Sequence, residues 1–266
     1  MSDIFKTINP LPQSLFSLNN PPKQLFYKGD LSLLNRFKIA IVGTRAPNQY
    51  TKMLTAEIAT SIAKYAVVVS GGALGVDIIA HKGAYPNTIM ISPSSLDIIY
   101  PSENKKIIQD IAQNALIISE YEKCYMPQRH SFLERNRIVI ALSDIVILPQ
   151  GDLRSGTHSS ANFAMSLKKP IFTLPHRYDE SSLTNFLLAQ GKAKAIYNID
   201  DFIKNHIPNS HKIVDSAKSV ETSDEILAFC AKKPSFEEAV ARFGNKILEY
   251  EFEGLLVREN NIIKTK

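Results

Sequence analysis

Short apolar runs alternate with helix-like segments along most of this chain, from Lys38 to about residue 190. The apolar runs contain few polar residues and predict buried strands, whereas the segments between them repeat apolar positions at the spacing of a helix. The predicted strands are 38–44, 66–70, 88–92, 115–119, 144–149 and 170–175, and the predicted helices are 53–65, 75–85, 102–114, 132–143, one within 157–168 and one near 182–190. This order predicts an α/β fold with a mostly parallel sheet that carries helices on both faces.

Both ends of the chain depart from this alternation. The first 37 residues are rich in Pro and Asn and predict an irregular lead-in, which we expect to pack on the core through Leu25, Phe26 and Tyr27. Near the other end, a polar stretch predicts a linker, and three short amphipathic helices with a hairpin predict a winged-helix-like domain. The expected organisation is a lead-in over 1–37, a sheet domain over 38–205, a linker over 206–222 and a small domain over 223–266.

The charge of the chain is modest and unevenly distributed. Of its 266 residues 44% are hydrophobic, and the formal net charge is +5 with a pI of about 9.0. Residues 224–266 contain seven basic and eight acidic side chains, so the rest of the chain carries a net charge of +6. A basic surface favours anionic partners, and this distribution places any phosphate-binding surface in the larger N-terminal part.

Cysteine usage and the length of the apolar runs indicate the compartment. The two cysteines, Cys124 and Cys230, form no CxxC pair, and we expect free thiols in a reducing environment. The first residues show no charged region followed by an apolar stretch, and no apolar run approaches the roughly 18 residues of a membrane span. We therefore expect a cytoplasmic protein without a membrane segment.

Three predicted strands are followed by polar or glycine-bearing loops, at 43–51, 70–75 and 149–160. Glycine lets the backbone approach a ligand closely, and the free N–H groups at the start of the next helix favour an anion. The turn Ser70–Gly71–Gly72 is therefore a candidate cradle for a phosphate; the alternative is that its glycines serve the geometry of the turn alone. Neither GxGxxG nor GxxxxGK[ST] occurs in the sequence, which argues against a dinucleotide cofactor and against ATP.

Arginines gather in and near these loops. Arg45 follows the first predicted strand, at the mouth of the expected crevice, where it either meets a phosphate or remains solvated. The segment "RHSFLERNR" (129–137) combines several arginines with one aromatic ring, and a helix would place Arg129, Phe132 and Asn136 on one face. Guanidinium groups bind phosphates and an aromatic ring offers a surface for an unpaired base, although a basic first turn on an apolar helix explains the same residues.

No catalytic or metal-binding group emerges from the remaining polar residues. Asp77 and His81 are four residues apart on one predicted helix, but they lack a nucleophile and a third ligand. We interpret the pair as a hydrogen bond within the helix or as residues that shape the preceding glycine turn. His130, His158 and His176 fit no ligand spacing. The sequence therefore predicts no catalytic residue, no metal and no cofactor.

The order of these motifs resembles the bacterial DNA-processing protein A family, also called DprA or Smf. The matching segments lie within about residues 20–195 and read "NNPPKQLFYKGD", "IAIVGTR", "VVSGGALGVDIIAH", "TIMISPSSLDIIYPSEN", "IISEY", "RNRIVIALSD", "SGTHSSA" and "PIFTLP". The resemblance implies an extended Rossmann-like domain that dimerises and binds single-stranded DNA. It also implies that the protein protects incoming DNA from nucleases and delivers it to the recombinase RecA during natural transformation.

The candidate DNA-binding residues come from two sources. The resemblance implies contacts from Arg45, the Ser–Gly–Gly turn, the Arg–Asn–Arg segment and the Ser–Gly loop, whereas Arg129 and Phe132 are added for their charge and stacking surface. The full set is Gly43, Thr44, Arg45, Ser70, Gly71, Gly72, Arg129, Phe132, Arg135, Asn136, Arg137, Ser155, Gly156 and Thr157.

Two other interpretations stay open. One is an enzyme that acts on nucleoside phosphates, similar to the lysine-decarboxylase-like phosphoribohydrolases; "PQGDLRSGTHSS" approximates their PGGxGTxxE loop, but Ser160 stands where that motif has its carboxylate. The other is a pure scaffold, which leaves the basic, glycine-rich loops without a role. In the C-terminal module, Glu249, Glu251 and Glu253 would repel duplex phosphates, so we predict a protein-interaction role for it.

Overall fold

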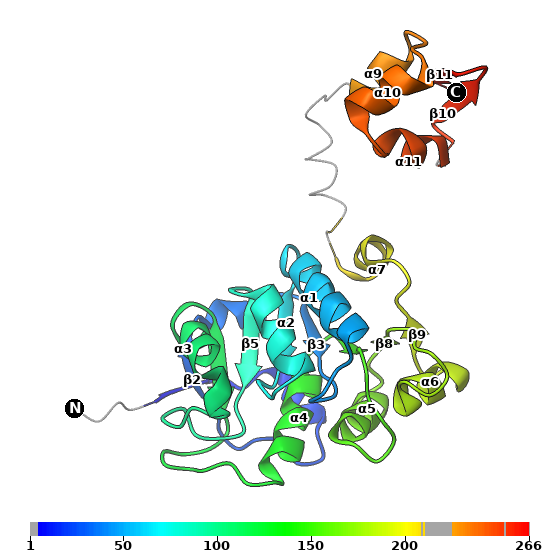
Figure 1. The fold of residues 1–266 in the computed structure, drawn as a ribbon. Helices are drawn as coiled ribbons and strands as arrows, with labels where there is room; N and C mark the ends of the chain where they lie inside the picture. The colour runs from blue at the N-terminus through cyan, green and yellow to red at the C-terminus, as the bar shows by residue number, and fades with distance from the viewer. Residues whose placement is uncertain (1–4, 209, 211–224, 253, 266) are drawn as a thin grey trace. The chain divides into compact units, whose positions relative to one another are not determined.

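The computed structural model describes residues 5–208, 210, 225–252 and 254–265, in two compact units that divide the chain at residues 210 and 211. The larger unit contains a nine-stranded sheet with the order β1-β2-β6-β5-β4-β3-β7-β8-β9 (Figure 1). All neighbouring strands from β6 to β9 are parallel, whereas β1–β2 and β2–β6 are antiparallel, which confirms the mostly parallel sheet. The strands are β1 Lys6–Thr7, β2 Phe26–Gly29, β3 Lys38–Ile41, β4 Val67–Ser70, β5 Thr88–Ile91, β6 Leu116–Ser119, β7 Ile145–Leu148, β8 Ile171–Thr173 and β9 Lys194–Ala195.

Helices occupy the connections between the parallel strands, as the sequence predicts. The largest shift of a boundary is at α1, which begins before Met53 because the side chain of Asn48 caps it by accepting from the backbone N–H of Thr51 at 2.8 Å. The segment predicted as one helix over 102–114 opens with a short 3-10 turn. The helices of this unit are η1 Gln13–Ser17, η2 Leu31–Asn35, α1 Gln49–Ala63, α2 Val76–Ala84, η3 Ser102–Asn104, α3 Lys105–Asn114, α4 Ser131–Leu142, α5 Gly156–Ser166, α6 Ser182–Ala189 and α7 Ile199–His206.

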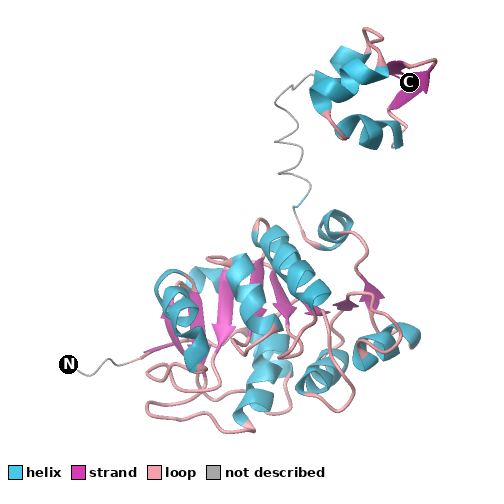
Figure 2. Cartoon of the chain, viewed as in Figure 1, coloured by secondary structure: helices cyan, strands magenta, loops and turns pink. Residues whose placement is uncertain are grey.

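The sheet separates two apolar layers, and alternate residues of the central strands point into different layers. Ile39 and Ile41 of β3 pack in the layer that contains α1, α2 and α7, whereas Ala40 and Val42 pack in the layer that contains α4 and α5. Figure 2 shows the strands of this sheet with helices around them. All four side chains are buried. Helices therefore cover both faces of the sheet, and this is why the central strands read as continuous apolar runs.

The lead-in is more regular than the sequence predicts. Its segment Phe26–Gly29 forms β2, which pairs antiparallel with β6 and extends the sheet, and Lys6–Thr7 pairs with β2 in turn. The prediction of an irregular segment was wrong here because the Pro- and Asn-rich flanks conceal a strand of four residues. The predicted anchor Leu25 is fully buried.

The strand order reverses between β3 and β7. From β3 the chain adds β4, β5 and β6 on one side, and it then returns to place β7, β8 and β9 on the other. In open parallel sheets such a switch point leaves a crevice outside the carboxyl ends of the two strands, since their loops turn in opposite directions. The loops that follow β3 and β7 are two of the three loops singled out in the sequence.

The smaller unit consists of three short helices and one hairpin in the part that the structure describes. A capping box starts its second helix, in which Ser235 and Glu238 satisfy each other's backbone N–H groups. This content agrees with the expected three helices and hairpin, and the winged-helix assignment itself stays a prediction. The predicted linker lies almost wholly outside the described residues. The elements are α9 Glu225–Cys230, α10 Phe236–Phe243, α11 Lys246–Phe252, β10 Leu256–Glu259 and β11 Ile262–Thr265.

Two expectations about the whole chain can be compared with the described residues. None of the helices described in the two units is both long and apolar enough to cross a membrane. Cys124 is a free, exposed thiol, and Cys230 is buried.

His81 gives the fold a defined dependence on pH. The ring is fully buried on α2, and its Nδ1 lies 2.7 Å from the hydroxyl of Thr88. Burial, with a smaller contribution from the charge of Arg135, lowers the pKa of His81 to about 3. Because the unfolded chain takes up a proton near pH 6.5 and the folded chain does not, this contribution to stability is full above pH 6.5 and falls as the pH drops toward 3.

We predict that the free energy of unfolding of the wild type falls between pH 6 and 4.5 by up to about 1.4 kcal/mol per pH unit more than that of His81→Gln. Urea denaturation at several pH values measures this difference in slope. The exposed His130 provides the control, since His130→Gln should keep the wild-type slope. Equal slopes for the wild type and His81→Gln would contradict the assignment.

Candidate nucleic-acid interface

A groove with a cavity of about 860 Å³ lies at the switch point between β3 and β7. Its walls come from the loop after β3, the loop after β7 with the start of α5, and the start of α4 with the segment before it. We call it the switch-point groove. It is lined by Val42, Gly43, Thr44, Arg45, Ala73, Asp77, Tyr100, Pro127, Gln128, Arg129, Phe132, Leu133, Arg135, Asn136, Arg154, Ser155, Gly156, Thr157, His158, Ser159 and Ser160.

Most of the candidate residues from the sequence meet in this groove, although they come from three separate segments of the chain. The candidates that line it are Gly43, Thr44, Arg45, Arg129, Phe132, Arg135, Asn136, Ser155, Gly156 and Thr157. The candidates outside its lining are Ser70, Gly71, Gly72 and Arg137. The expected common face of Arg129, Phe132 and Asn136 is present, even though Arg129 precedes the first residue of α4.

Three arginines supply positive charge to the groove. Arg45, Arg129 and Arg154 are all exposed, and each comes from a different wall. Arg154 is not among the residues predicted from the sequence. Its backbone has a φ of 65°, a left-handed conformation that is uncommon for a residue with a side chain. The signal that could have found it was its position one residue before the Ser155 cap of α5.

Arg45 and Phe132 contact each other within the groove. The guanidinium carbon of Arg45 lies 4.9 Å from the centre of the Phe132 ring, which is a cation–π distance. A second ring, Tyr100, lies 5.6 Å from Phe132 between centres, at an interplanar angle of 60°. Charge and aromatic surface are therefore adjacent, as contacts to both the phosphates and the bases of a nucleic acid would need.

The first turn of α5 forms the opposite wall. The side chain of Ser155 caps the helix by accepting from the backbone N–H of His158, 3.3 Å away. Gly156 and Thr157 follow at the start of the helix, where the backbone N–H groups give a partial positive charge. Thr157 is buried and Gly156 is exposed, so the backbone at Gly156 is open to a ligand.

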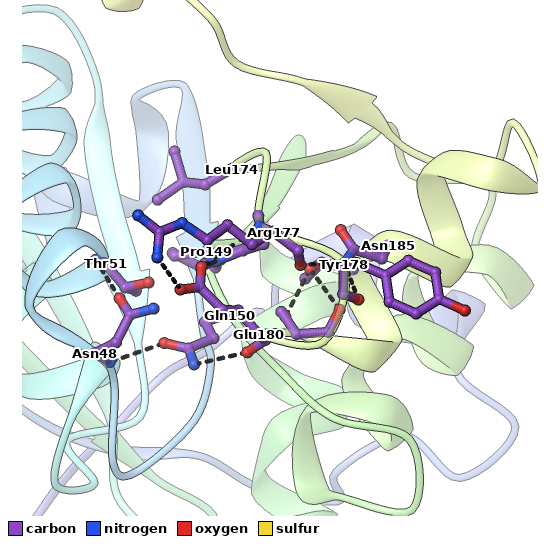
Figure 3. A network of polar contacts seen from close by, with 12 residues as sticks. Asn48, Thr51, Pro149, Gln150, Leu174, Arg177, Tyr178, Glu180 and Asn185 are labelled. Carbon is purple, nitrogen blue, oxygen red and sulfur yellow. Dashed lines mark hydrogen bonds and ion pairs between the residues drawn. The ribbon is translucent and has the colours of Figure 1, made fainter.

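A network of polar contacts holds the walls on both sides of the switch point (Figure 3). The side chain of Gln150 accepts from the backbone N–H of Asn48 at 3.0 Å and donates to the carbonyl of Glu180 at 3.3 Å. His176 donates from Nε2 to the carbonyl of Pro149 at 2.7 Å. The loops after β3, β7 and β8 are thereby joined, which fixes the position of the segment that carries Arg45.

The Ser70–Gly71–Gly72 turn differs from the expected phosphate cradle. All three residues are buried, and the hydroxyl of Ser70 donates to the carbonyl of Ile41 at 2.6 Å. A methyl group on Gly71 would lie only 1.3 Å from Nη1 of Arg135. The turn is thus small because the guanidinium of Arg135 packs against it, and its three residues lie outside the lining of the groove.

Arg135 occupies the floor of the groove as a buried cation. It donates from Nη1 to the carbonyl of Ile91 at 3.0 Å, and its Nη2 lies 3.8 Å from the carboxylate of Asp77. Burial lowers the pKa of Arg135 to about 10, although Asp77 acts in the opposite direction. The side chain therefore keeps its charge at neutral pH.

Asp77 is the anion that the glycine turn holds. Its carboxylate receives the backbone N–H groups of Ala73 and Gly43 and faces Arg135. Burial raises the pKa of Asp77, while Arg135 and the two N–H groups partly offset that increase. Of the two interpretations of Asp77 and His81, the structure supports the shaping of the turn, because Asp77 receives the N–H group of Ala73 beside the turn and the His81 ring pairs with Thr88 on β5.

Arg137 also lies away from the groove. It is two residues beyond Arg135 on α4, so the helical rotation directs it to a different side of the helix. Its Nη2 donates to Glu120 at 2.5 Å, and both side chains are mostly buried. The resemblance implies a DNA contact from the whole segment Arg135–Arg137, but the structure places Arg137 outside the lining of the groove.

We predict that Gly71→Ala lowers the free energy of unfolding by about 1–3 kcal/mol, because the added methyl group displaces Arg135 from its buried partners. Denaturant titration of both proteins measures this difference. Gly156→Ala provides the matched control, since no atom of the described residues lies within 4 Å of the added atom and α5 tolerates alanine. A Gly71→Ala protein as stable as the control would show that Arg135 is not held as described.

Comparisons with known proteins agree with this architecture. The family model for DNA recombination-mediator protein A matches residues 4–206. The DNA processing protein DprA of Bacillus subtilis is 34% identical over 210 residues, which cover 74% of this chain and 71% of that protein. The DNA processing protein DprA of Streptococcus pneumoniae is 34% identical over 167 residues, but the match covers only 59% of its length.

Two solved structures share the fold of the larger unit. A structure of DNA processing protein A from Helicobacter pylori, described for its single-stranded DNA binding mode, has a TM-score of 0.74 and 55% identity, and the match covers 76% of this chain and 94% of that one. The structure of DprA from Streptococcus pneumoniae has a TM-score of 0.72 and 30% identity, over 77% of this chain and 75% of that one. The chain belongs to the DNA recombination-mediator protein A family.

Proposed function

We propose that this protein binds single-stranded DNA, without sequence preference, in the switch-point groove. The observation that carries the proposal is that three exposed arginines and two aromatic rings meet in one groove at the carboxyl ends of parallel strands. The Helicobacter pylori relative, at 55% identity, is described as binding single-stranded DNA, which supports the same ligand here.

Each wall of the groove has its own part in this proposal. Arg45, Arg129 and Arg154 contact backbone phosphates, and the N-terminal turn of α5 adds backbone N–H groups at Gly156. Aromatic side chains accept unpaired bases, whose faces are available in a single strand but stacked in a duplex. Because neither phosphates nor ring faces depend on the base, binding tolerates any sequence.

The candidates outside the groove act indirectly. Ser70, Gly71 and Gly72 form the buried surface against which Arg135 packs, and Arg135 in turn forms the floor beneath the ligand. Arg137 holds Glu120 and thereby the segment that follows β6. We assign these residues to positioning the groove, while the residues that line it make the contacts.

Membership of the family supports a wider role in DNA processing. We propose that the protein works in the cytoplasm as a dimer, protects incoming DNA during natural transformation and helps to load RecA on it. The smaller unit, in which Glu249 and Glu251 lie on α11, is assigned to contacts with protein. Since the chain spans 59% of the Streptococcus pneumoniae relative, these roles of whole relatives remain proposals.

The groove offers little support for the nucleoside-phosphate enzyme. Ser160 is buried, and its hydroxyl accepts from Nδ2 of Asn136 at 3.0 Å, so it does not replace the missing carboxylate. The carboxylate that lines the groove, Asp77, is 5% exposed and already faces two backbone N–H groups and Arg135. We therefore propose a binding protein and not an enzyme.

We predict that Arg45→Ala weakens binding to oligo-dT by about 1–3 kcal/mol, because a charge-assisted contact to phosphate is lost. Fluorescence anisotropy with a labelled oligonucleotide across a salt series measures both the affinity and its salt dependence. If Arg45 neutralises one phosphate, the slope of log K against log salt becomes less negative by about 0.7.

Lys64→Ala is the matched control, because it also removes one positive charge from an exposed side chain. Lys64 lies at the C-terminal end of α1, whereas Arg45 lies in the loop that precedes this helix. This variant should bind as the wild type does. A duplex of the same sequence should bind more weakly than the single strand. Equal effects of the two substitutions, or no binding of oligo-dT by the wild type, would refute the proposed function.

A further inference from the structure

The ring of Tyr100 lies in the switch-point groove but was not a candidate in the sequence. It belongs to the loop that follows β5, an element that supplies none of the arginines of the groove. Tyrosine is amphipathic, so a partly exposed tyrosine inside a basic groove offers both a ring face and a hydroxyl to a ligand.

Phe132, the ring predicted from the sequence to stack on a base, is already covered in part. Arg45 lies over it at 4.9 Å from guanidinium carbon to ring centre, and the residue is half-buried. A base that stacks on this face must first displace Arg45. Such a displacement costs the cation–π contact and moves the guanidinium away from its place above the ring.

Tyr100 is more open. Its ring meets Phe132 at 5.6 Å between centres and at an angle of 60°, so the two rings do not lie face to face. The residue is 39% exposed, which places it among the exposed large side chains of the protein. A tilted contact covers only part of a ring, and Tyr100 is among the residues that line the groove.

The loop of Tyr100 is held in place by the buried residues that follow the tyrosine. Pro101, which follows the tyrosine, is buried, and Asn104 at the end of η3 donates from Nδ2 to the carbonyl of Gly72 at 3.1 Å. The buried glycine turn therefore fixes the loop that carries this ring, in addition to holding Arg135 and Asp77. A ring on a fixed loop loses little freedom when a ligand stacks on it.

We propose that Tyr100 is a base-stacking residue of the groove, and that Phe132 supports it by contacting both Tyr100 and Arg45. This inference rests on the proposed function, because it assumes a single strand in the groove. The inference adds a base contact to the residues that were chosen for their charge or their place in a family motif. In this arrangement Arg45 contacts a phosphate and Tyr100 stacks on a base.

Three variants and two ligands test this assignment in the full chain. Stacking of one base is worth about 1–3 kcal/mol, so Tyr100→Leu should weaken binding of oligo-dT at least about fivefold, whereas Tyr100→Phe should bind within about twofold of the wild type. Tyr85→Leu is the matched control, since Tyr85 is 37% exposed and also precedes a proline, but it lies after α2, before the start of β5. An abasic oligomer of equal length should bind equally well to all four proteins.

The outcomes separate the two proposals. If the wild type binds neither ligand, the proposed function fails and this inference fails with it. If the wild type binds oligo-dT and Tyr100→Leu binds it equally well, only the stacking role is wrong. If Tyr100→Leu loses the same affinity for oligo-dT and for the abasic oligomer, the stacking role is also wrong, because the ring would then act only on the shape of the groove.

A measurement on the unaltered protein avoids any effect of the substitutions on folding. An oligonucleotide with 5-iodouracil, irradiated in complex with the wild type, forms a covalent link to a ring that stacks on the modified base. Mass spectrometry should find the adduct on a peptide that contains Tyr100. An adduct confined to the peptide that contains Phe132 would contradict the assignment.

Discussion

The buried guanidinium of Arg135 is the group on which the arrangement of the groove depends. It fills the space left by the missing side chain of Gly71, donates to the carbonyl of Ile91 and faces the carboxylate of Asp77. These contacts join α4, the ends of β4 and β5, and the start of α2. A buried charge without such partners would cost several kcal/mol, so the glycine turn, the carboxylate and the arginine require one another.

The arginines of the groove have two different roles, one structural and one in binding. Arg135 and Asp77 balance each other beneath the surface, which leaves Arg45, Arg129 and Arg154 as exposed cations above them. A ligand therefore meets positive charge without having to break the internal pair. Long-range attraction of a polyanion comes from such exposed charge, and it weakens as salt is added.

The fold could be predicted from the sequence further than the groove could. Continuous apolar strands such as Val67–Ser70 showed a parallel sheet, because burial on both faces leaves a pattern within a few neighbouring residues. Neighbouring residues do not show whether Ser70 or Arg137 is exposed. Ser70 is buried against Ile41 and Arg137 against Glu120, and both partners are distant in the chain. Tyr100 was missed for the same reason, since its neighbour Phe132 comes from another element.

Hydrogen–deuterium exchange of the full chain, with and without oligo-dT, tests most directly whether the switch-point groove is the DNA-binding surface. We predict that added DNA slows exchange in peptides that cover 43–48, 129–136 and 154–160, the three walls of the groove. Slower exchange confined to residues 225–252 and 254–265, or to the opposite end of the sheet around 7–14 and 31–38, would contradict it.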